Sequence, residues 1–333
     1  MIVLAGDIGG TKTNIGLFEV RNKRVNSIIE QSYPSSAYLS LADIIEQFLA
    51  ALEKPLQQQV TQACFGVAGP VENNCCQVTN LPWFVDAQQI EQQFSWQNVK
   101  LLNDLEANAW GLAALSDGDF ICLNPGQKYL ANASIIAAGT GLGQAGLFWD
   151  GKRHIPFASE GGHSDFSPAT EHEYRLHQYL QEKYQGHVSW ERIVSGMGLV
   201  NLYQFLCQDR QQQSPSWLQK QMIEADAAAA ISKAALATDS TRHDDLCLQA
   251  LDWFVHFYAL EAANQALKIM SRGGVFLGGG IAPKIIKHLQ TGSFMKSFVN
   301  KGRMQNLLQS MPVNVIMNDK TALYGPAIYA ESH

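Results

Sequence analysis

Short apolar segments alternate with amphipathic ones along this chain, which predicts a mixed α/β protein. Residues 2–5, 63–68, 99–102 and 274–277 are brief apolar runs of the kind that form buried strands. Residues 39–52 carry apolar side chains at helical spacing, so that one face of a helix would be buried. Strands that alternate with helices are typical of an α/β fold.

The rest of the chain adds longer helical patterns. A glycine-rich hairpin is expected near residues 134–149 and a further strand at residues 313–317. Helices are expected at residues 105–115, 170–183, 190–207, 218–236, 244–270, 281–290 and 321–330. We find no convincing sequence repeat.

The length of the chain predicts two lobes with a cleft between them. The chain has 333 residues, more than the roughly 250–300 at which a single core stops growing. We expect a small α/β domain of residues 1–113 plus about 318–333, and a large α/β domain with helical segments at residues 114–317.

The first of three glycine clusters consists of Gly6, Asp7, Ile8, Gly9, Gly10 and Thr11. It is nearly a P-loop, but that motif needs glycine in place of Thr11 and a helix after it. Residues 14–20 are rich in strand formers, so the segment joins two strands. Taken alone, a plain hairpin turn is the better interpretation. Such a turn still presents N–H groups and the Thr11 hydroxyl to phosphates, and Asp7 is a candidate ligand of Mg²⁺, directly or through water.

The other two glycine clusters follow later strands. Gly139, Thr140 and Gly141 begin a segment with dinucleotide-type glycine spacing, but a strand follows where that motif needs a helix. A second phosphate-facing hairpin therefore fits better. Gly278 and Gly279 lie before a predicted helix, whose N-terminus suits a phosphate or the adenosine, while a tight strand–helix turn explains them equally well. Together, the three clusters predict phosphate contacts from both lobes.

Five polar residues form a candidate pocket for a sugar. Asn103 and Asp104 lie between a strand and a helix, where capping alone explains them, but catalytic groups also collect at strand ends. Glu160 and His163 flank two glycines, and Glu191 lies near the start of the predicted helix 190–207, where the helix dipole alone would explain an acid. No second histidine has metal-ligand spacing from His163, which disfavours zinc. A carboxylate accepts from two neighbouring hydroxyls at once, so this set suits a hexose.

Composition excludes several classes of partner. The net charge is −6 and the basic residues are scattered, which disfavours nucleic acid. The 6 cysteines form no C-x-x-C pair, as expected for free thiols in a reducing compartment. The N-terminus does not resemble a signal peptide, and no apolar run reaches the ~18 residues of a membrane span. We therefore expect a cytoplasmic protein without a membrane or nucleic-acid partner.

Several segments, in order along essentially the whole chain, resemble the bacterial ATP-dependent glucokinase family. They are residues 6–11, 102–104, 138–143, 160–166, 187–196 and 278–283. The Glu-Gly-Gly-His segment and the Glu-Arg-Ile-Val-Ser-Gly segment are the specific ones. The resemblance implies a two-lobed actin-like ATPase (ribonuclease H-like) fold with a central cleft. It also implies phosphorylation of D-glucose at its 6-hydroxyl by ATP and Mg²⁺, the first step of glycolysis.

The resemblance also assigns roles to residues. It makes Asp104 the general base, and Asn103, Glu160, His163 and Glu191 the sugar ligands. It places the three glycine clusters around ATP and implies a homodimer. This chain departs from the family at Lys12, Thr13 and Asn14, where the family often has Asn-x-Arg, so the role of Lys12 stays open.

Other interpretations of the sequence also stay open. They are a kinase for another hexose, an actin-like ATP-binding module without kinase activity, and a sugar sensor. The zinc motif of the repressor–ORF–kinase family is absent, which argues against that branch.

Overall fold

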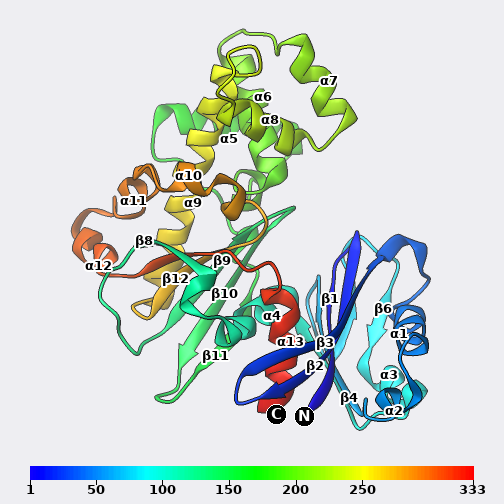
Figure 1. Cartoon of the computed structure of the whole chain (residues 1–333). Coiled ribbons are helices and arrows are strands. Elements are labelled where there is room, and N and C mark those ends of the chain that lie inside the picture. Colours follow the sequence, from blue (N-terminus) through cyan, green and yellow to red (C-terminus); the bar gives the residue numbers. More distant parts are fainter. The chain divides into compact units, whose positions relative to one another are not determined.

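In the computed structural model, which describes residues 1–333, the chain divides into two units (Figure 1). The first unit consists of Met1–Asp119, Ile155–Ala158 and Asn318–His333. The second consists of Phe120–His154 and Ser159–Met317. Each unit has a sheet with its own hydrophobic core.

The sheet of the first unit has the strand order β3-β2-β1-β4-β7. Its strands are β1 (Ile2–Ile8), β2 (Lys12–Arg21), β3 (Arg24–Pro34), β4 (Gln62–Val67) and β7 (Asn98–Asn103). The first three strands form an antiparallel meander, whereas β1, β4 and β7 are parallel. Two short strands, β5 (Cys75–Gln77) and β6 (Phe84–Asp86), pair separately.

Helices cover both faces of this sheet. Successive side chains of a strand point to opposite faces, and those of β1 are apolar on both, so each face needs a cover. Leu4 and Ile8 of β1 join the core cluster of α1 (Leu41–Ala50) and α3 (Ala87–Phe94). Val3 and Ala5 join the cluster of α4 (Asp104–Gly111) and α13 (Thr321–Ser332). A short helix, α2 (Lys54–Gln57), completes the unit.

The sheet of the second unit contains the order β10-β9-β12-β13-β8. Its strands are β8 (Phe120–Asn124), β9 (Ala133–Ala138), β10 (Leu142–Trp149), β12 (Gly274–Gly278) and β13 (Val313–Ile316), and β11 (His154–Ser159) follows β10 along the chain. β9 is antiparallel to β10 and parallel to β12, which is parallel to β13. The order β10-β9-β12-β13 therefore repeats β2-β1-β4-β7 with the same directions.

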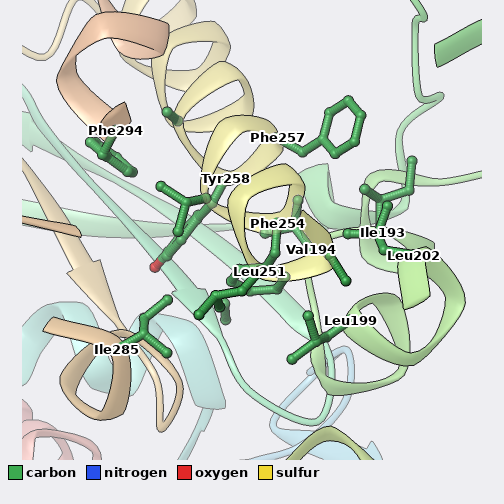
Figure 2. Close-up of a cluster of buried hydrophobic side chains, with 14 of the residues drawn as sticks. Ile193, Val194, Leu199, Leu202, Leu251, Phe254, Phe257, Tyr258, Ile285 and Phe294 are labelled. Carbon is green, nitrogen blue, oxygen red and sulfur yellow. The ribbon is translucent and has the colours of Figure 1, made fainter. Parts of the chain in front are cut away.

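The core of the second unit surrounds the helix α9. The helices of this unit are α5 (Glu171–Tyr184), α6 (Gly196–Asp209), α7 (Ser216–Glu224), α8 (Ala227–Leu236), α9 (Asp245–Ile269), α10 (Ile286–Leu289), α11 (Ser293–Phe298) and α12 (Gln305–Gln309). Figure 2 shows Phe254 and Tyr258 of α9 among side chains from other helices, including Leu199 of α6 and Phe294 of α11. The buried Tyr258 hydroxyl donates to the Ile136 carbonyl of β9 at 3.0 Å, which ties α9 to the sheet.

Three predicted helices are wrong in their extent. The helix expected at residues 190–207 is a 3₁₀ turn, Trp190–Arg192, followed by α6, because Ser195 caps the new helix by accepting from the Gly198 N–H. The helix expected at residues 218–236 is two helices, since Asp226 caps α8 in the same way. The segment at residues 281–290 is a 3₁₀ turn, Ala282–Ile285, and the single turn of α10.

Candidate active site

In the first unit, the predicted nucleotide and catalytic residues lie where the parallel strands end. The register pairs Ile8 of β1 with Val67 of β4, and Val67 with Asn103 of β7. The first glycine cluster and the Asn103–Asp104 pair therefore reach the same edge of the sheet. Ligands of open α/β sheets bind beyond the carboxyl ends of the strands.

The first glycine cluster is a strand–turn–strand, as its context predicted. The Gly9 N–H donates to the Lys12 carbonyl at 3.0 Å. The buried Ser35 hydroxyl donates to the Gly9 carbonyl at 2.7 Å and lies 3.0 Å from the Thr13 hydroxyl. Ser35 thus holds the turn from the end of β3, while Thr11 is exposed. Sequence reasoning missed Ser35, because nothing local connects it to the glycines.

Asp7 is a half-buried carboxylate with few partners. Burial raises its pKa, and the hydrogen bond from Asn14 and the charge of Lys12 oppose the rise. The Asn14 amide is 3.5 Å away, at the limit of a hydrogen bond, so most of the acceptor capacity of Asp7 is unused. No cluster of three or more His, Cys, Asp or Glu side chains suits a metal ion. Mg²⁺ is commonly held by one or two carboxylates plus substrate phosphates, so Asp7 fits an ion that arrives with a nucleotide.

Asn103 is the N-cap of α4, which confirms the capping interpretation. Its Oδ1 accepts from the N–H groups of Leu105 at 2.9 Å and Glu106 at 3.4 Å, and its Nδ2 donates to the Gly69 carbonyl at 3.2 Å. Asp104 is the first residue of the helix, and its Oδ1 accepts from the Leu105 N–H at 2.9 Å. These contacts fix both side chains at the carboxyl end of β7.

The second and third glycine clusters meet in the second unit. The register pairs Gly278 with Ala137, and the Ile281 N–H donates to the Ala138 carbonyl at 3.2 Å. Gly279 has a φ of +80° and lies so close to Ala138 that a side chain would overlap it. The Gly139 carbonyl accepts from the Gly196 N–H at 2.8 Å, so the N-terminus of α6 joins the same site.

Leu142, the first residue of β10, connects the second glycine turn to the predicted sugar ligands. Its N–H donates to Glu191 Oε2 at 3.0 Å. A Cβ on Gly141 would lie 2.5 Å from that same oxygen. On the other side, Gly162 packs against the Leu142 carbonyl so closely that a Cβ would overlap it. The Glu191 side chain is therefore held by the backbone of Leu142. The helix-dipole interpretation is wrong, because Glu191 lies in a 3₁₀ turn and not at the start of a long helix.

Glu160 and His163 present their side chains to solvent from a fixed turn. The exposed fractions of their side chains are 63% and 62%, and Oε2 and Nε2 are 3.9 Å apart. The turn is joined to the Glu191 segment, because the Trp190 N–H donates to the Ser164 carbonyl at 3.0 Å. The second unit thus brings Glu160, His163 and Glu191 together with the glycine turn at Gly139–Gly141.

The chain is similar to known glucokinases along almost its whole length. The profile of the glucokinase family matches residues 4–333. A glucokinase of Nostoc sp. is 40% identical over 344 aligned positions, which cover 99% of this chain and 98% of the relative. The chain belongs to the glucokinase family.

Solved structures of other glucokinases share the fold. A glucokinase from an Antarctic psychrotroph has a TM-score of 0.83 at 25% identity, covering 100% of this chain and 99% of that one. A ROK family glucokinase from Streptomyces griseus, in complex with glucose and AMPPNP, has a TM-score of 0.64 at 19% identity with both chains covered completely. The expected actin-like ATPase fold is confirmed. None of the helices combines the length and the apolar character that a bilayer crossing requires.

The contact between Gly162 and Leu142 predicts a large effect on stability. Gly162→Ala forces a methyl group into the Leu142 carbonyl, and we expect it to lower the free energy of unfolding by about 3 kcal/mol or more. Gly139→Ala is the matched control, because a Cβ there meets no atom within 4 Å, and it should change stability by less than about 1 kcal/mol. Urea unfolding measures both, and equal effects of the two variants would contradict the packing argument.

Proposed function

We propose that this protein transfers the γ-phosphoryl group of ATP to the 6-hydroxyl of D-glucose, giving glucose 6-phosphate and ADP. The observation that carries the proposal is the connection at Leu142 between the glycine turn and three exposed or half-exposed polar side chains. A turn that suits phosphates and a group that suits hydroxyls are thereby held next to each other. Membership of the glucokinase family supports the same reaction.

The sugar is bound by Glu160, His163, Glu191 and Asn103. The carboxylates accept from hydroxyl groups, and the imidazole of His163 donates or accepts. The amide oxygen of Asn103 is used by the helix cap, so Asn103 contributes the second N–H of its amide nitrogen, beside the one that Gly69 accepts. Glu191 Oε2 already accepts from Leu142, so its other oxygen faces the sugar.

ATP is bound by the glycine turns. The residues are Gly6, Asp7, Ile8, Gly9, Gly10 and Thr11 in the first unit, and Gly139, Thr140, Gly141, Gly278 and Gly279 in the second. The backbone N–H groups and the Thr11 hydroxyl contact the phosphates. Asp7 holds Mg²⁺, which supplies neutralisation of the phosphate charge when it is bound.

Asp104 is the general base. As the bond from the sugar oxygen to phosphorus forms and the bond to ADP breaks, the Asp104 carboxylate takes the proton of the 6-hydroxyl. The transition state of phosphoryl transfer is loose, so most of the catalysis comes from positioning and from charge stabilisation. The hydrogen bond from Leu105 holds one Asp104 oxygen in place for this role.

We also propose a cellular location, an assembly state and a place in metabolism. The protein acts in the cytoplasm as a homodimer, in the first step of glycolysis, without a nucleic-acid or membrane partner. The net charge of −6 and the scattered basic residues support the absence of nucleic acid, and the family resemblance supports the homodimer.

Product analysis with glucose, ATP and Mg²⁺ tests the reaction. We expect glucose 6-phosphate and ADP in equal amounts. Parallel reactions with fructose, mannose and an N-acetylhexosamine identify a kinase for another sugar, if one of these is turned over faster. ATP turnover that sugar does not stimulate would favour an actin-like ATP-binding module, and tight glucose binding without a product would favour a sensor.

Asp104→Asn tests the general base. We expect kcat to fall by about 10²–10⁴-fold while the Kd for glucose changes little, because the amide keeps the shape of the side chain but cannot take the proton. Glu106→Gln is the control, since it removes a carboxylate two residues further along α4 and should keep kcat near the wild-type value. A near-normal kcat in Asp104→Asn would remove Asp104 from this role.

Gly141→Ala tests the connection between the turn and the sugar. The new methyl group would lie 2.5 Å from Glu191 Oε2, so the carboxylate must leave its bond with Leu142. We expect the KM for glucose to rise about tenfold, which corresponds to about 1.4 kcal/mol. This is close to the lower end of the ~1.5–3 kcal/mol that a hydrogen bond to a charged group contributes. Steady-state kinetics measure this, with Gly118→Ala as the control, because a Cβ there would meet only Ser116 Oγ at 3.9 Å. A rise confined to the KM for ATP would refute the connection.

A further inference from the structure

A buried polar network lies behind the Glu160 turn and has no part in the chemistry described above. At its centre is Glu261 of α9, whose exposed fraction is 1%. Its Oε1 accepts from Gln144 Nε2 at 2.7 Å, and its Oε2 accepts from Asn264 Nδ2 at 2.9 Å. Lys301 Nζ donates to Asn264 Oδ1 at 2.7 Å, which places a positive charge at the far end of the chain of bonds.

Removing the charged and polar groups of this network from water costs free energy. Burial raises the pKa of Glu261, and the hydrogen bonds from Asn264 and Gln144 and the more distant charges of Lys268 and Lys301 oppose the rise. Apolar residues of similar volume often stabilise a core as well as a buried polar group does or better. A contribution to stability therefore explains this network poorly. A role in holding neighbouring segments in place explains it better.

Gln144 connects Glu261 to the turn that carries two predicted sugar ligands. It lies on β10 two residues after Leu142, and its exposed fraction is 4%. Its Oε1 packs directly against Gly161, so that a Cβ on that glycine would overlap it. The neighbouring Gly162 rests on the Leu142 carbonyl. Both glycines between Glu160 and His163 are thus supported by β10, one by its backbone and the other by the Gln144 side chain.

The amide of Gln144 is oriented by its partner. An amide nitrogen must face the carboxylate of Glu261, because a carboxylate only accepts. The amide oxygen is then forced toward Gly161, where it is found. A side chain without this orienting bond would rotate about its terminal torsion, which has broad preferences, and the support of the turn would move with it.

We propose that Gln144, oriented by Glu261, is a positioning residue that fixes the Gly161–Gly162 turn and hence the placement of Glu160 and His163 toward the sugar. This inference rests on the proposed function, since it assumes that these two side chains bind the sugar. It predicts an effect on sugar binding from residues that do not contact the sugar.

Reversal of the pair tests the proposal. Gln144→Glu places two carboxylates against each other, and we expect the KM and Kd for glucose to rise about tenfold or more, while the KM for ATP changes less than about threefold. The double variant Gln144→Glu/Glu261→Gln restores one carboxylate and one amide with the bond reversed. The amide oxygen of residue 261 then still accepts from Asn264, so we expect glucose affinity to return to within about threefold of the wild type.

A stability control separates positioning from a general loss of packing. Gln265→Leu removes a neighbouring buried amide of α9, which donates to the Ile135 and Ala145 carbonyls and does not touch the turn. It should lower the melting temperature without raising the KM for glucose. If Gln144→Glu does not fold, Gln144→Met serves instead, since it keeps the volume but loses the oriented amide, and we expect a several-fold rise in the KM for glucose.

Two results would overturn the proposal. One is an unchanged KM for glucose in the folded Gln144 variants, and the other is a rise that the double variant does not reverse. The wild-type protein is assayed in the same series, so absence of glucose 6-phosphate there would count against the proposed function. If the wild type phosphorylates glucose and the Gln144 variants bind glucose as tightly as the wild type does, only the positioning role is refuted.

Discussion

The backbone of Leu142 makes the two contacts on which the arrangement of the second unit depends. Its N–H binds Glu191 and its carbonyl lies against Gly162, so that one strand end sets the positions of two separate polar segments. Leu142 also follows directly on the glycine turn. The Glu191 segment, the Gly161–Gly162 turn and the Gly139–Gly141 turn therefore all meet at the backbone of one residue. Glycine is required at residues 141 and 162 for a steric reason, because a side chain at either would displace what Leu142 holds.

The two units use the same strand order for different tasks. In each, a hairpin turn follows the first parallel strand, at β1–β2 and at β9–β10, and the turn reaches the carboxyl edge of the sheet. The first unit adds Asp7 and Asp104, the groups suited to a cation and to a proton. The second unit adds Glu160, His163 and Glu191, which suit hydroxyls. The sequence shows no repeat because this topology constrains only the apolar pattern and the glycine turns, and leaves the other side chains free.

Local signals in the sequence predicted the backbone structure of several candidate site segments, whereas distant contacts determine others. The strand formers after Thr13 correctly indicated a hairpin in place of a P-loop, and the Asn103 cap followed from residue type alone. The prediction that Glu191 lies near the start of a long helix was wrong, because the helix begins only after Ser195. Its carboxylate is instead held by Leu142, which is distant in the sequence. The Gln144–Glu261 pair spans 117 residues, and an isolated glutamate within a helical pattern is usually an exposed residue.

Two carboxylates, the half-buried Asp7 and the buried Glu261, differ in how completely their hydrogen bonds are satisfied. Burial raises the pKa of both Asp7 and Glu261, so the pKa alone does not distinguish them. Glu261 accepts two short hydrogen bonds, at 2.7 and 2.9 Å, one at each oxygen. Asp7 accepts only one, at 3.5 Å. A carboxylate with unused acceptor capacity can still bind a ligand, whereas one whose two oxygens are both occupied within a core holds its neighbours in place. Asp7 therefore keeps acceptor capacity free, whereas both oxygens of Glu261 are occupied within the protein.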